Sequence, residues 1–238
     1  MQAFILAAGL GTRLRPLTNS RPKALVEVEG RTLLEINMLR LIEAGATRIV
    51  VNTHHYADMI RKFVESKRWD AEVLLSDESS LLLDTGGGLK KAEPQFRSDE
   101  PIIVHNVDVL HRLSLTDIVK QHTDSKALAT LCVSERSTSR YLLADDSQHL
   151  VGWTNVKTGE TLWSGNPVDG VRCLAFSGIA VVEAGLLPLL PPATAPYPII
   201  PQYLSIAKNH TINCVEHHPD DWMDVGKPET LPLASRLL

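Results

Sequence analysis

The residues from Leu6 to Leu25 combine a glycine-rich loop with several basic side chains. The loop reads Leu6-Ala7-Ala8-Gly9-Leu10-Gly11-Thr12 and directly follows an apolar run. Glycines let backbone N–H groups approach phosphate oxygens closely, because no Cβ atom intervenes. Arg13 and Lys23 add positive charge within the same segment. The segment therefore predicts a binding site for a phosphate chain.

Two common phosphate-binding loops are excluded here. A Walker A loop needs a lysine followed by serine or threonine after its last glycine, and Gly11 is followed by Thr12 and Arg13. A dinucleotide-binding fingerprint needs a third glycine, and Leu14 stands at that position. The missing third glycine also argues against a dehydrogenase.

A second glycine-rich segment reads Asp84-Thr85-Gly86-Gly87-Gly88. Three consecutive glycines before an expected helix are costly in backbone entropy. A close approach of the backbone to another group would explain them, and a flexible turn is the alternative.

Two aspartates stand where a metal ion could be bound. Asp108 comes shortly after an expected strand at 101–105, and ligands of open α/β sheets bind at the carboxyl ends of strands. Asp224 lies in Trp222-Met223-Asp224-Val225-Gly226. Carboxylates suit a hard cation such as Mg²⁺, although either aspartate alone is more often a cap or turn residue.

Strands and helices are expected to alternate along much of the chain. Thr32 is an expected helix N-cap with Glu35 three residues later, and Gly45 is a natural stop. A hairpin is expected over 141–153. The alternation predicts an α/β fold with a twisted, mostly parallel sheet in a single domain, 1–238. The expected strands are 3–8, 48–53, 71–75, 101–105, 127–133 and 172–182, and the expected helices are 32–44, 56–67 and 113–122.

Composition narrows the class of protein. The 238 residues include 24 Lys and Arg against 28 Asp and Glu, a net charge of −4, which argues against broad binding of nucleic acid or anionic membranes. No apolar stretch approaches the roughly 20 residues of a membrane helix, and the first residues lack the form of a signal peptide. Three cysteines without CxxC spacing indicate reduced thiols, so we expect a cytoplasmic protein.

The motifs together resemble those of the sugar-1-phosphate nucleotidyltransferases. The resemblance rests on G-x-G-T-R at 9–13, Pro22-Lys23, the glycines at 86–88, Phe176-Ser177-Gly178-Ile179 and the W-x-D-V-G segment at 222–226. It implies a three-layer, Rossmann-like nucleotidyltransferase fold of the glycosyltransferase-A-like type. The nucleotide would bind to a part covering about 1–133, and the sugar to a part covering about 134–238.

The resemblance also implies roles for individual residues. Arg13 would hold the outer phosphates of a nucleoside triphosphate, and Lys23 would bridge the α-phosphate and the sugar phosphate, where charge develops during in-line attack. Asp108 and Asp224 would share one Mg²⁺. The expected nucleotide-binding residues are Leu6, Ala7, Ala8, Gly9, Gly11, Thr12, Arg13, Gly86, Gly87 and Asn106, and the expected sugar-binding residues are Arg140, Ser177 and Gly178.

The sequence departs from the family pattern in three places. Val107 stands before the aspartate where the family usually has glycine, which puts in doubt how closely the backbone lies against the ribose. Lys227 stands where threonine is common. The family's E-K-P segment, whose lysine touches the sugar phosphate, is absent, and Lys157 and Arg140 are candidate substitutes.

The short length and the particular motifs most resemble the uridylyltransferases that use UTP and N-acetylmuramate 1-phosphate in cell-wall recycling. Guanylyl- or thymidylyltransferases acting on heptose, mannose or glucose 1-phosphate are the main alternative. A phosphocholine cytidylyltransferase and a catalytically silent nucleotide-sugar sensor are less favoured. We expect a monomer or weak homodimer whose partners are the two small substrates and Mg²⁺.

Overall fold

The computed structural model describes residues 1–238 and contains fourteen strands, five α-helices and six short 3₁₀ helices. The strands are β1 Gln2–Leu6, β2 Glu27–Val28, β3 Arg31–Thr32, β4 Arg48–Thr53, β5 Glu72–Asp77, β6 Ile102–Asn106, β7 Val109–His111, β8 Ala129–Ser134, β9 Arg140–Ala144, β10 Leu150–Asn155, β11 Glu160–Trp163, β12 Arg172–Val182, β13 Ile212–Glu216 and β14 Trp222–Asp224. The α-helices are α1 Leu33–Glu43, α2 Ala57–Glu65, α3 Asp84–Ala92, α4 Leu115–Ser125 and α5 Ile199–Ile206. The 3₁₀ helices are η1 Thr12–Leu14, η2 Lys23–Leu25, η3 Glu93–Gln95, η4 Ala184–Leu189, η5 Pro219–Asp221 and η6 Leu231–Leu237.

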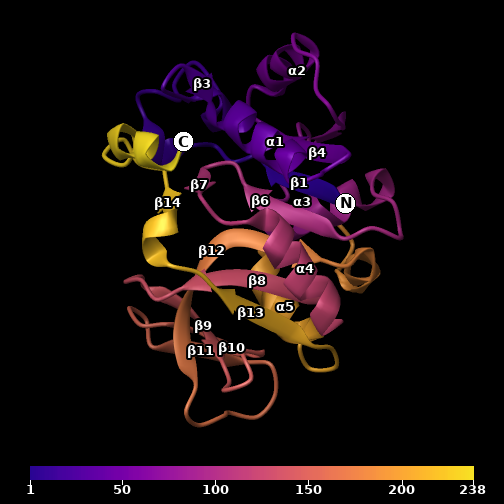
Figure 1. The fold of residues 1–238 in the computed structure, drawn as a ribbon, viewed down its shortest axis with the longest axis vertical. Helices are drawn as coiled ribbons and strands as arrows, with labels where there is room; N and C mark the ends of the chain where they lie inside the picture. The colour runs from indigo at the N-terminus through magenta and orange to yellow at the C-terminus, as the bar shows by residue number, and fades with distance from the viewer.

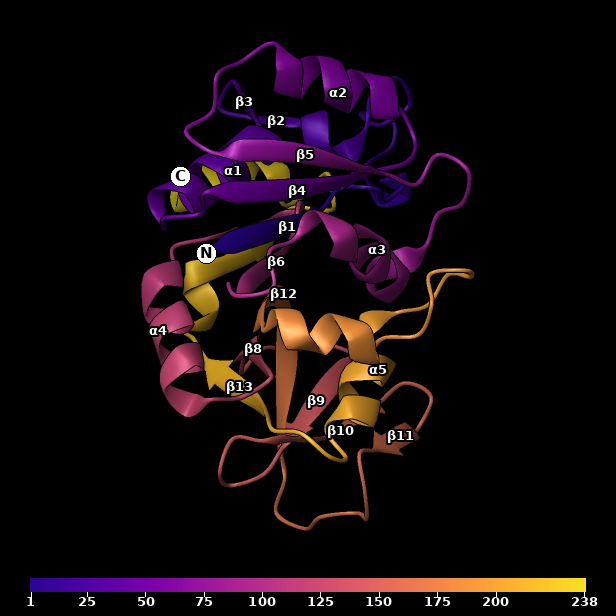
Figure 2. The same ribbon diagram turned by 90° about the vertical axis from the view of Figure 1, so that its right-hand side faces the viewer.

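The apolar β1 strand is buried on both faces, as its unbroken hydrophobic run requires. Ala3 and Ile5 belong to the core packed under α1 and α2, whereas Phe4 belongs to the opposite core, which includes α3 and α5. The helices lie around a large sheet that runs through the molecule (Figures 1 and 2). The expectation of an α/β fold with three layers is confirmed.

The main sheet has ten strands and is mixed in direction. Its central order is β11-β10-β9-β12-β6-β1-β4-β5, with β8 paired to β12 and β13. The strands β5, β4, β1 and β6 are parallel, but β12 joins β6 in the antiparallel direction. The parallel pairing predicted from the sequence is thus found among these four strands and again between β8 and β13, and antiparallel pairs make the sheet mixed. Between 134 and 182 no helix separates the strands, and such short connections join antiparallel neighbours.

Local signals place most of the elements correctly. The Thr32 hydroxyl accepts the N–H of Glu35 at 3.1 Å at the start of α1, and Gly45 adopts φ +95° just after this helix. The expected hairpin is formed by β9 and β10, and β12 covers 172–182 as predicted. One boundary differs: α3 begins at Asp84, so the three glycines lie inside its first two turns and not before it.

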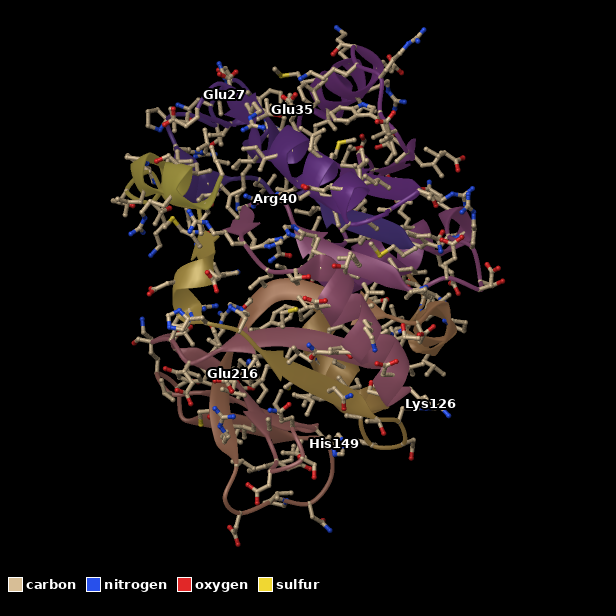
Figure 3. The ribbon with its side chains drawn as sticks, viewed as in Figure 1. Glu27, Glu35, Arg40, Lys126, His149 and Glu216 are labelled. Atoms are coloured by element: carbon tan, nitrogen blue, oxygen red, sulfur yellow. The ribbon has the colours of Figure 1, made fainter.

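The last part of the chain returns to the N-terminal half. Strand β14 pairs with β7 in the antiparallel direction, with Asp224 opposite Val109, and the Val225 N–H donates to the Asp108 carbonyl at 2.8 Å. The following η6 segment, yellow in Figure 1, lies beside the N-terminal elements. Arg40 of α1, labelled in Figure 3, donates to the carbonyl of Leu237 in this segment. This return brings the two distant aspartates together. None of the helices has the length and apolar character needed to cross a membrane.

Candidate active site

Two cavities meet at Asn106 and Asp108, at the carboxyl end of β6. The first, about 470 Å³, is lined by Leu6, Ala8, Gly9, Lys23, Asn52, Glu78, Leu82, Asp84, Thr85, Asn106, Val107, Asp108 and Pro196. The second, about 760 Å³, is lined by Arg13, Asn106, Asp108, Val109, Arg136, Ser137, Thr138, Ser139, Arg140, Phe176, Ser177, Gly178, Pro219, Trp222, Met223, Asp224, Lys227 and Thr230. The two share only Asn106 and Asp108, so these residues mark the junction where groups held in the two cavities can meet.

The glycine-rich loop at the edge of the first cavity has free backbone donors. The N–H groups of Gly9, Leu10 and Gly11 make no hydrogen bond within the chain. The preceding N–H groups of Ala7 and Ala8 both donate to the Asn52 side-chain oxygen, at 2.6 and 3.1 Å. The loop is thus tied down at its base and leaves the donors beyond it available for an anion.

Asn52 is itself held by a buried glutamate that the sequence analysis did not identify. The Asn52 amide donates to Glu78 Oε1 at 2.7 Å, and the second carboxylate oxygen accepts the Leu83 N–H at 2.9 Å. Burial raises the pKa of Glu78, and these two hydrogen bonds oppose that shift. The pair links β4 and β5 to the glycine-rich loop. The only sequence signal was a polar residue, Asn52, near the end of an otherwise apolar strand.

Positive and negative side chains converge at the junction of the cavities. Lys23 Nζ contacts Asp108 Oδ2, and both side chains are mostly buried. Arg13 bridges the two aspartates, with Nη2 at 3.5 Å from Asp108 Oδ2 and Nη1 at 3.4 Å from Asp224 Oδ2. The four residues that the sequence assigned to phosphate and metal binding therefore form one cluster, although 211 positions separate Arg13 from Asp224.

The residues at this cluster suit a bound Mg²⁺. A Cβ atom at Gly226 would lie 2.6 Å from Asp224 Oδ1 and 2.8 Å from Asp108 Oδ2, so the two carboxylates face each other across a backbone without a side chain. The Gly226 N–H donates to Asp224 Oδ1 at 2.6 Å and orients that carboxylate. Mg²⁺ takes one or two protein carboxylates and completes its shell with water and phosphate oxygens. The donor set fits this pattern.

The three glycines of α3 approach groups of the same chain. The N–H groups of Gly86 and Gly87 donate to the Tyr197 carbonyl at 3.0 and 3.3 Å, and a Cβ atom at Gly86 would lie 2.6 Å from the Tyr197 ring. A Cβ atom at Gly88 would lie 2.7 Å from Glu78 Oε1. These contacts account for the close approach that the sequence predicted. Asp84 and Thr85 line the first cavity, whereas Gly86 and Gly87 do not.

Of the other residues expected to bind the nucleotide, some line the first cavity and others do not. Leu6, Ala8, Gly9 and Asn106 line the first cavity, but Ala7, Gly11 and Thr12 do not. Val107 packs into the core under α1, where its carbonyl accepts the buried Asn37 amide at 2.9 Å. The valine side chain thus has its own place in the core, and Asn106 and Asp108 on either side of it both line the cavities.

Residues at a bulge in β12 line part of the second cavity. The strand register shifts between Phe176 and Ala180, and Gly178 adopts φ +72° beside the Asn106 amide, 2.5 Å from the position a Cβ would take. The Trp222 indole N–H donates to the Ser177 carbonyl at 2.7 Å. Ser177 and Gly178, both expected from their motif to bind sugar, line this cavity.

The Ser177 hydroxyl is oriented by a histidine that the sequence analysis did not select. His217 Nδ1 donates to the His218 carbonyl at 2.9 Å, which leaves Nε2 as an acceptor for the Ser177 hydroxyl at 2.7 Å. Burial lowers the pKa of His217, the hydrogen bond to the His218 carbonyl raises it, and nearby Arg136 lowers it further. The neutral ring thus accepts the hydroxyl proton of Ser177, whose side chain is fully buried, and holds it in place beside the cavity.

Three basic residues noted in the sequence, Arg140, Lys157 and Lys227, and a fourth found only in the structure, Arg136, are compared by their position at the second cavity. Arg140 and Lys227 line it, whereas Lys157 lies in the turn between β10 and β11 and lines neither cavity. Arg136, which the sequence analysis did not select, lies at the cavity with its guanidinium 4.1 Å from the Trp222 ring centre. Burial lowers the pKa of Arg136, and nearby Asp224 opposes that shift.

Comparisons with known proteins identify the family of this chain and its fold. Residues 2–145 match the family described as nucleotidyl transferase. The chain is 34% identical to N-acetylmuramate alpha-1-phosphate uridylyltransferase of Caulobacter vibrioides over 95% of this chain and 92% of that protein. It is 30% identical to mannose-1-phosphate guanyltransferase of Pichia angusta over 96% of this chain and 62% of that protein. The crystal structure of HddC from Yersinia pseudotuberculosis complexed with GMP-PN superposes with a TM-score of 0.76 at 21% identity, covering 99% of this chain and 98% of that one, which shows a shared fold.

Proposed function

This chain belongs to the nucleotidyl transferase family, and we propose that it transfers the uridylyl group of UTP to N-acetylmuramate 1-phosphate, with release of pyrophosphate. The observation that carries the proposal is the cluster of Arg13, Lys23, Asp108 and Asp224 at the junction of two cavities. The similarity to the Caulobacter enzyme over nearly the whole of both chains supports this choice of substrates.

In the proposed reaction, an oxygen of the sugar phosphate attacks the α-phosphorus of the triphosphate in line. The new P–O bond forms as the bond from the α-phosphorus to the oxygen bridging to the β-phosphate breaks, and pyrophosphate leaves with that oxygen. A phosphate monoester is already ionised at pH 7, so the reaction needs no general base. The protein has to bring two anions together and stabilise the charge that develops between them.

The first cavity would hold the nucleotide, because Gly9 lines it and the backbone N–H groups from Gly9 to Gly11 are free of hydrogen bonds within the chain. The second cavity would hold the sugar, with its phosphate directed to Asn106 and Asp108, where the cavities meet. Lys23 lies at this junction and would contact the α-phosphate, and Arg13 would bind the outer phosphates. Both side chains now contact carboxylates, and phosphate oxygens would replace those contacts.

Asp108 and Asp224 would hold the Mg²⁺. Bound there, the ion would neutralise triphosphate charge and polarise the α-phosphoryl group. The carboxylates are held in place by the pairing of β7 with β14 and by the Gly226 N–H. We also propose a cytoplasmic location and a role in cell-wall recycling, which the three unpaired cysteines and the similarity to the Caulobacter enzyme support.

Pyrophosphate release tests the proposal. UTP, dTTP, GTP, CTP and ATP should each be combined with N-acetylmuramate, mannose, glucose and heptose 1-phosphates in the presence of Mg²⁺. We expect the strongest release with UTP and N-acetylmuramate 1-phosphate. Strong release with another pair would keep the reaction and reassign the substrates. Absence of pyrophosphate release with every pair of substrates, together with binding of nucleotide sugars, would indicate a nucleotide-sugar sensor and contradict the proposed activity.

A further inference from the structure

Arg136 at the second cavity is a partly buried cation that forms no ion pair, although Asp224 lies near it. It follows β8, and its guanidinium lies beside Trp222, Phe176 and the cavity. Its one hydrogen bond is from Nη2 to the Phe176 carbonyl, at 2.7 Å, and its Nε is shielded from solvent with no acceptor. A cation in such a position is costly unless an anion compensates it.

Two contacts hold the Arg136 guanidinium in one orientation. The Trp222 ring covers one face at 4.1 Å, and the Phe176 carbonyl accepts from one edge. Neither contact carries a negative charge, and Nη1 makes no bond within the chain. A guanidinium fixed in this way binds a phosphate or carboxylate group with little further loss of conformational freedom.

The charges at the junction of the two cavities are arranged differently. Lys23 of the first cavity contacts Asp108, and Arg13, which lines the second cavity, contacts both Asp108 and Asp224. Arg136, Arg140 and Lys227 form no ion pair, although all three line the second cavity. Its two carboxylates, Asp108 and Asp224, already contact Arg13. Four cations therefore line the second cavity against two carboxylates, and three of these cations form no ion pair.

We infer that Arg136 binds an anionic group of the sugar-phosphate substrate, either its 1-phosphate or a carboxylate carried on the sugar. This inference rests on the proposed function, because it assigns the second cavity to the sugar. Arg136 would serve as a substrate-binding residue that the sequence motifs do not identify. It would take the place of the lysine that is absent between β9 and β12.

The variant Arg136→Gln tests the charge directly, because a glutamine amide can still donate to the Phe176 carbonyl. Loss of a charge-assisted pair should raise the KM for the sugar 1-phosphate by about 10- to 100-fold, while the KM for UTP changes by less than about twofold. Arg136→Lys keeps the charge without the planar group and should give an intermediate KM. Arg61→Gln, an exposed arginine on α2, is the matched control and should change neither KM. Thermal unfolding of each variant checks that the fold is intact.

Equilibrium binding distinguishes the two anionic groups. Calorimetry with N-acetylmuramate 1-phosphate and with N-acetylglucosamine 1-phosphate compares sugars that differ by one carboxylate-bearing ether. Equal weakening of both ligands in Arg136→Gln assigns Arg136 to the phosphate, and weakening of N-acetylmuramate 1-phosphate alone assigns it to the carboxylate. Unchanged affinity for both ligands overturns the inference.

The same titration separates this inference from the proposed reaction. If the native protein releases no pyrophosphate from any pair, the proposed function fails. Weaker binding of a sugar phosphate to Arg136→Gln would then still support the role of Arg136. Absence of sugar-phosphate binding by the native protein would overturn it.

Discussion

The two cavities of the site are built in different ways. The first is formed largely by short segments at the carboxyl ends of parallel strands, and Gly9, Asn52 and Asp108 each follow or end such a strand. The second is assembled from loops and antiparallel strands that are far apart in the chain, and three of its four cations, Arg136, Arg140 and Lys227, form no ion pair. In the proposed reaction, phosphate binding would thus depend on compact local motifs, whereas recognition of the second substrate would depend on how distant segments are packed.

Among the substitutions that test the difference between the cavities, the largest effect on activity is expected for Asp108, which lines both. In Asp108→Asn the amide keeps the shape of the side chain but loses the charge that a metal ion needs, so we expect loss of Mg²⁺-dependent pyrophosphate release. Titration with Mn²⁺ should show weakened metal binding, and circular dichroism an unchanged fold. Asp99→Asn, an exposed aspartate before β6, is the control. Activity retained in Asp108→Asn would remove this residue from the metal site.

The next largest effect should follow from Lys23→Ala, which removes only the lysine cation at the junction of the two cavities. By analogy with the loss of one preorganised charge stabiliser, kcat should fall by about 10²–10³-fold. Steady-state kinetics at saturating concentrations of both substrates measures this change, with Lys62→Ala on the exposed face of α2 as the control. A kcat within about threefold of the native value would show that Lys23 does not act at the reacting phosphate.

A smaller effect, confined to the first cavity, is expected for Asn52→Ala. The change leaves the N–H groups of Ala7 and Ala8 without their acceptor and Glu78 without one donor. Loss of such buried hydrogen bonds should lower the free energy of unfolding by about 1–3 kcal/mol and raise the KM for the nucleotide. Urea unfolding and kinetics with each substrate varied in turn provide the test. An equal rise in the KM for the sugar phosphate would contradict the separation of the two cavities.

The smallest effect is on the pH dependence of stability. It is expected from His105 on β6, the strand between the N-terminal and C-terminal halves of the sheet. Burial lowers the pKa of this histidine to about 4, although the hydrogen bond at Asn106 opposes the shift. The unfolded chain therefore binds the proton more readily, so stability is complete above about pH 6.5 and is lost as the pH falls toward 4. The loss should be about 1.4 kcal/mol per pH unit for this histidine.

Urea unfolding of the native protein and of His105→Gln at pH 7.5, 6.5 and 5.5 measures this slope. We expect a shallower pH dependence in the variant, although buried His111, whose pKa burial also lowers, retains part of it. Parallel pH profiles for the two proteins would show that His105 does not bind a proton on unfolding.

Much of the first cavity could be predicted from the sequence, because its groups lie within short segments next to strands. The glycine-rich loop, Lys23, Asn106 and Asp108 are recognisable from their neighbours along the chain, and the structure brings them together. Asn52 and Glu78 were missed, since each is a single polar residue and their hydrogen bond forms only when β4 and β5 lie side by side. The glycines of α3 were recognised as a close approach, but not as an approach to Tyr197.

The second cavity was only partly predictable. The motif at 176–179 located Ser177 and Gly178, but Arg136 stands in a stretch of ordinary polar residues without a recognisable motif. Its position at the cavity depends on Trp222, which lies 86 positions further along and reaches it only through the pairing of β14 with β7.

The sequence by itself determined the groups to which the proposed chemistry is assigned: a glycine-rich loop, two cations, two carboxylates and an alternation of strands and helices that places them at one edge of a sheet. Only the tertiary structure decided the direction of β12, the meeting of Asp108 with Asp224, and the unpaired charge of Arg136. The physical reason is the separation along the chain over which each kind of interaction acts. Backbone conformation and burial periodicity act between neighbours in the chain, whereas charge compensation and cavity shape arise between segments that meet only after the whole core has packed.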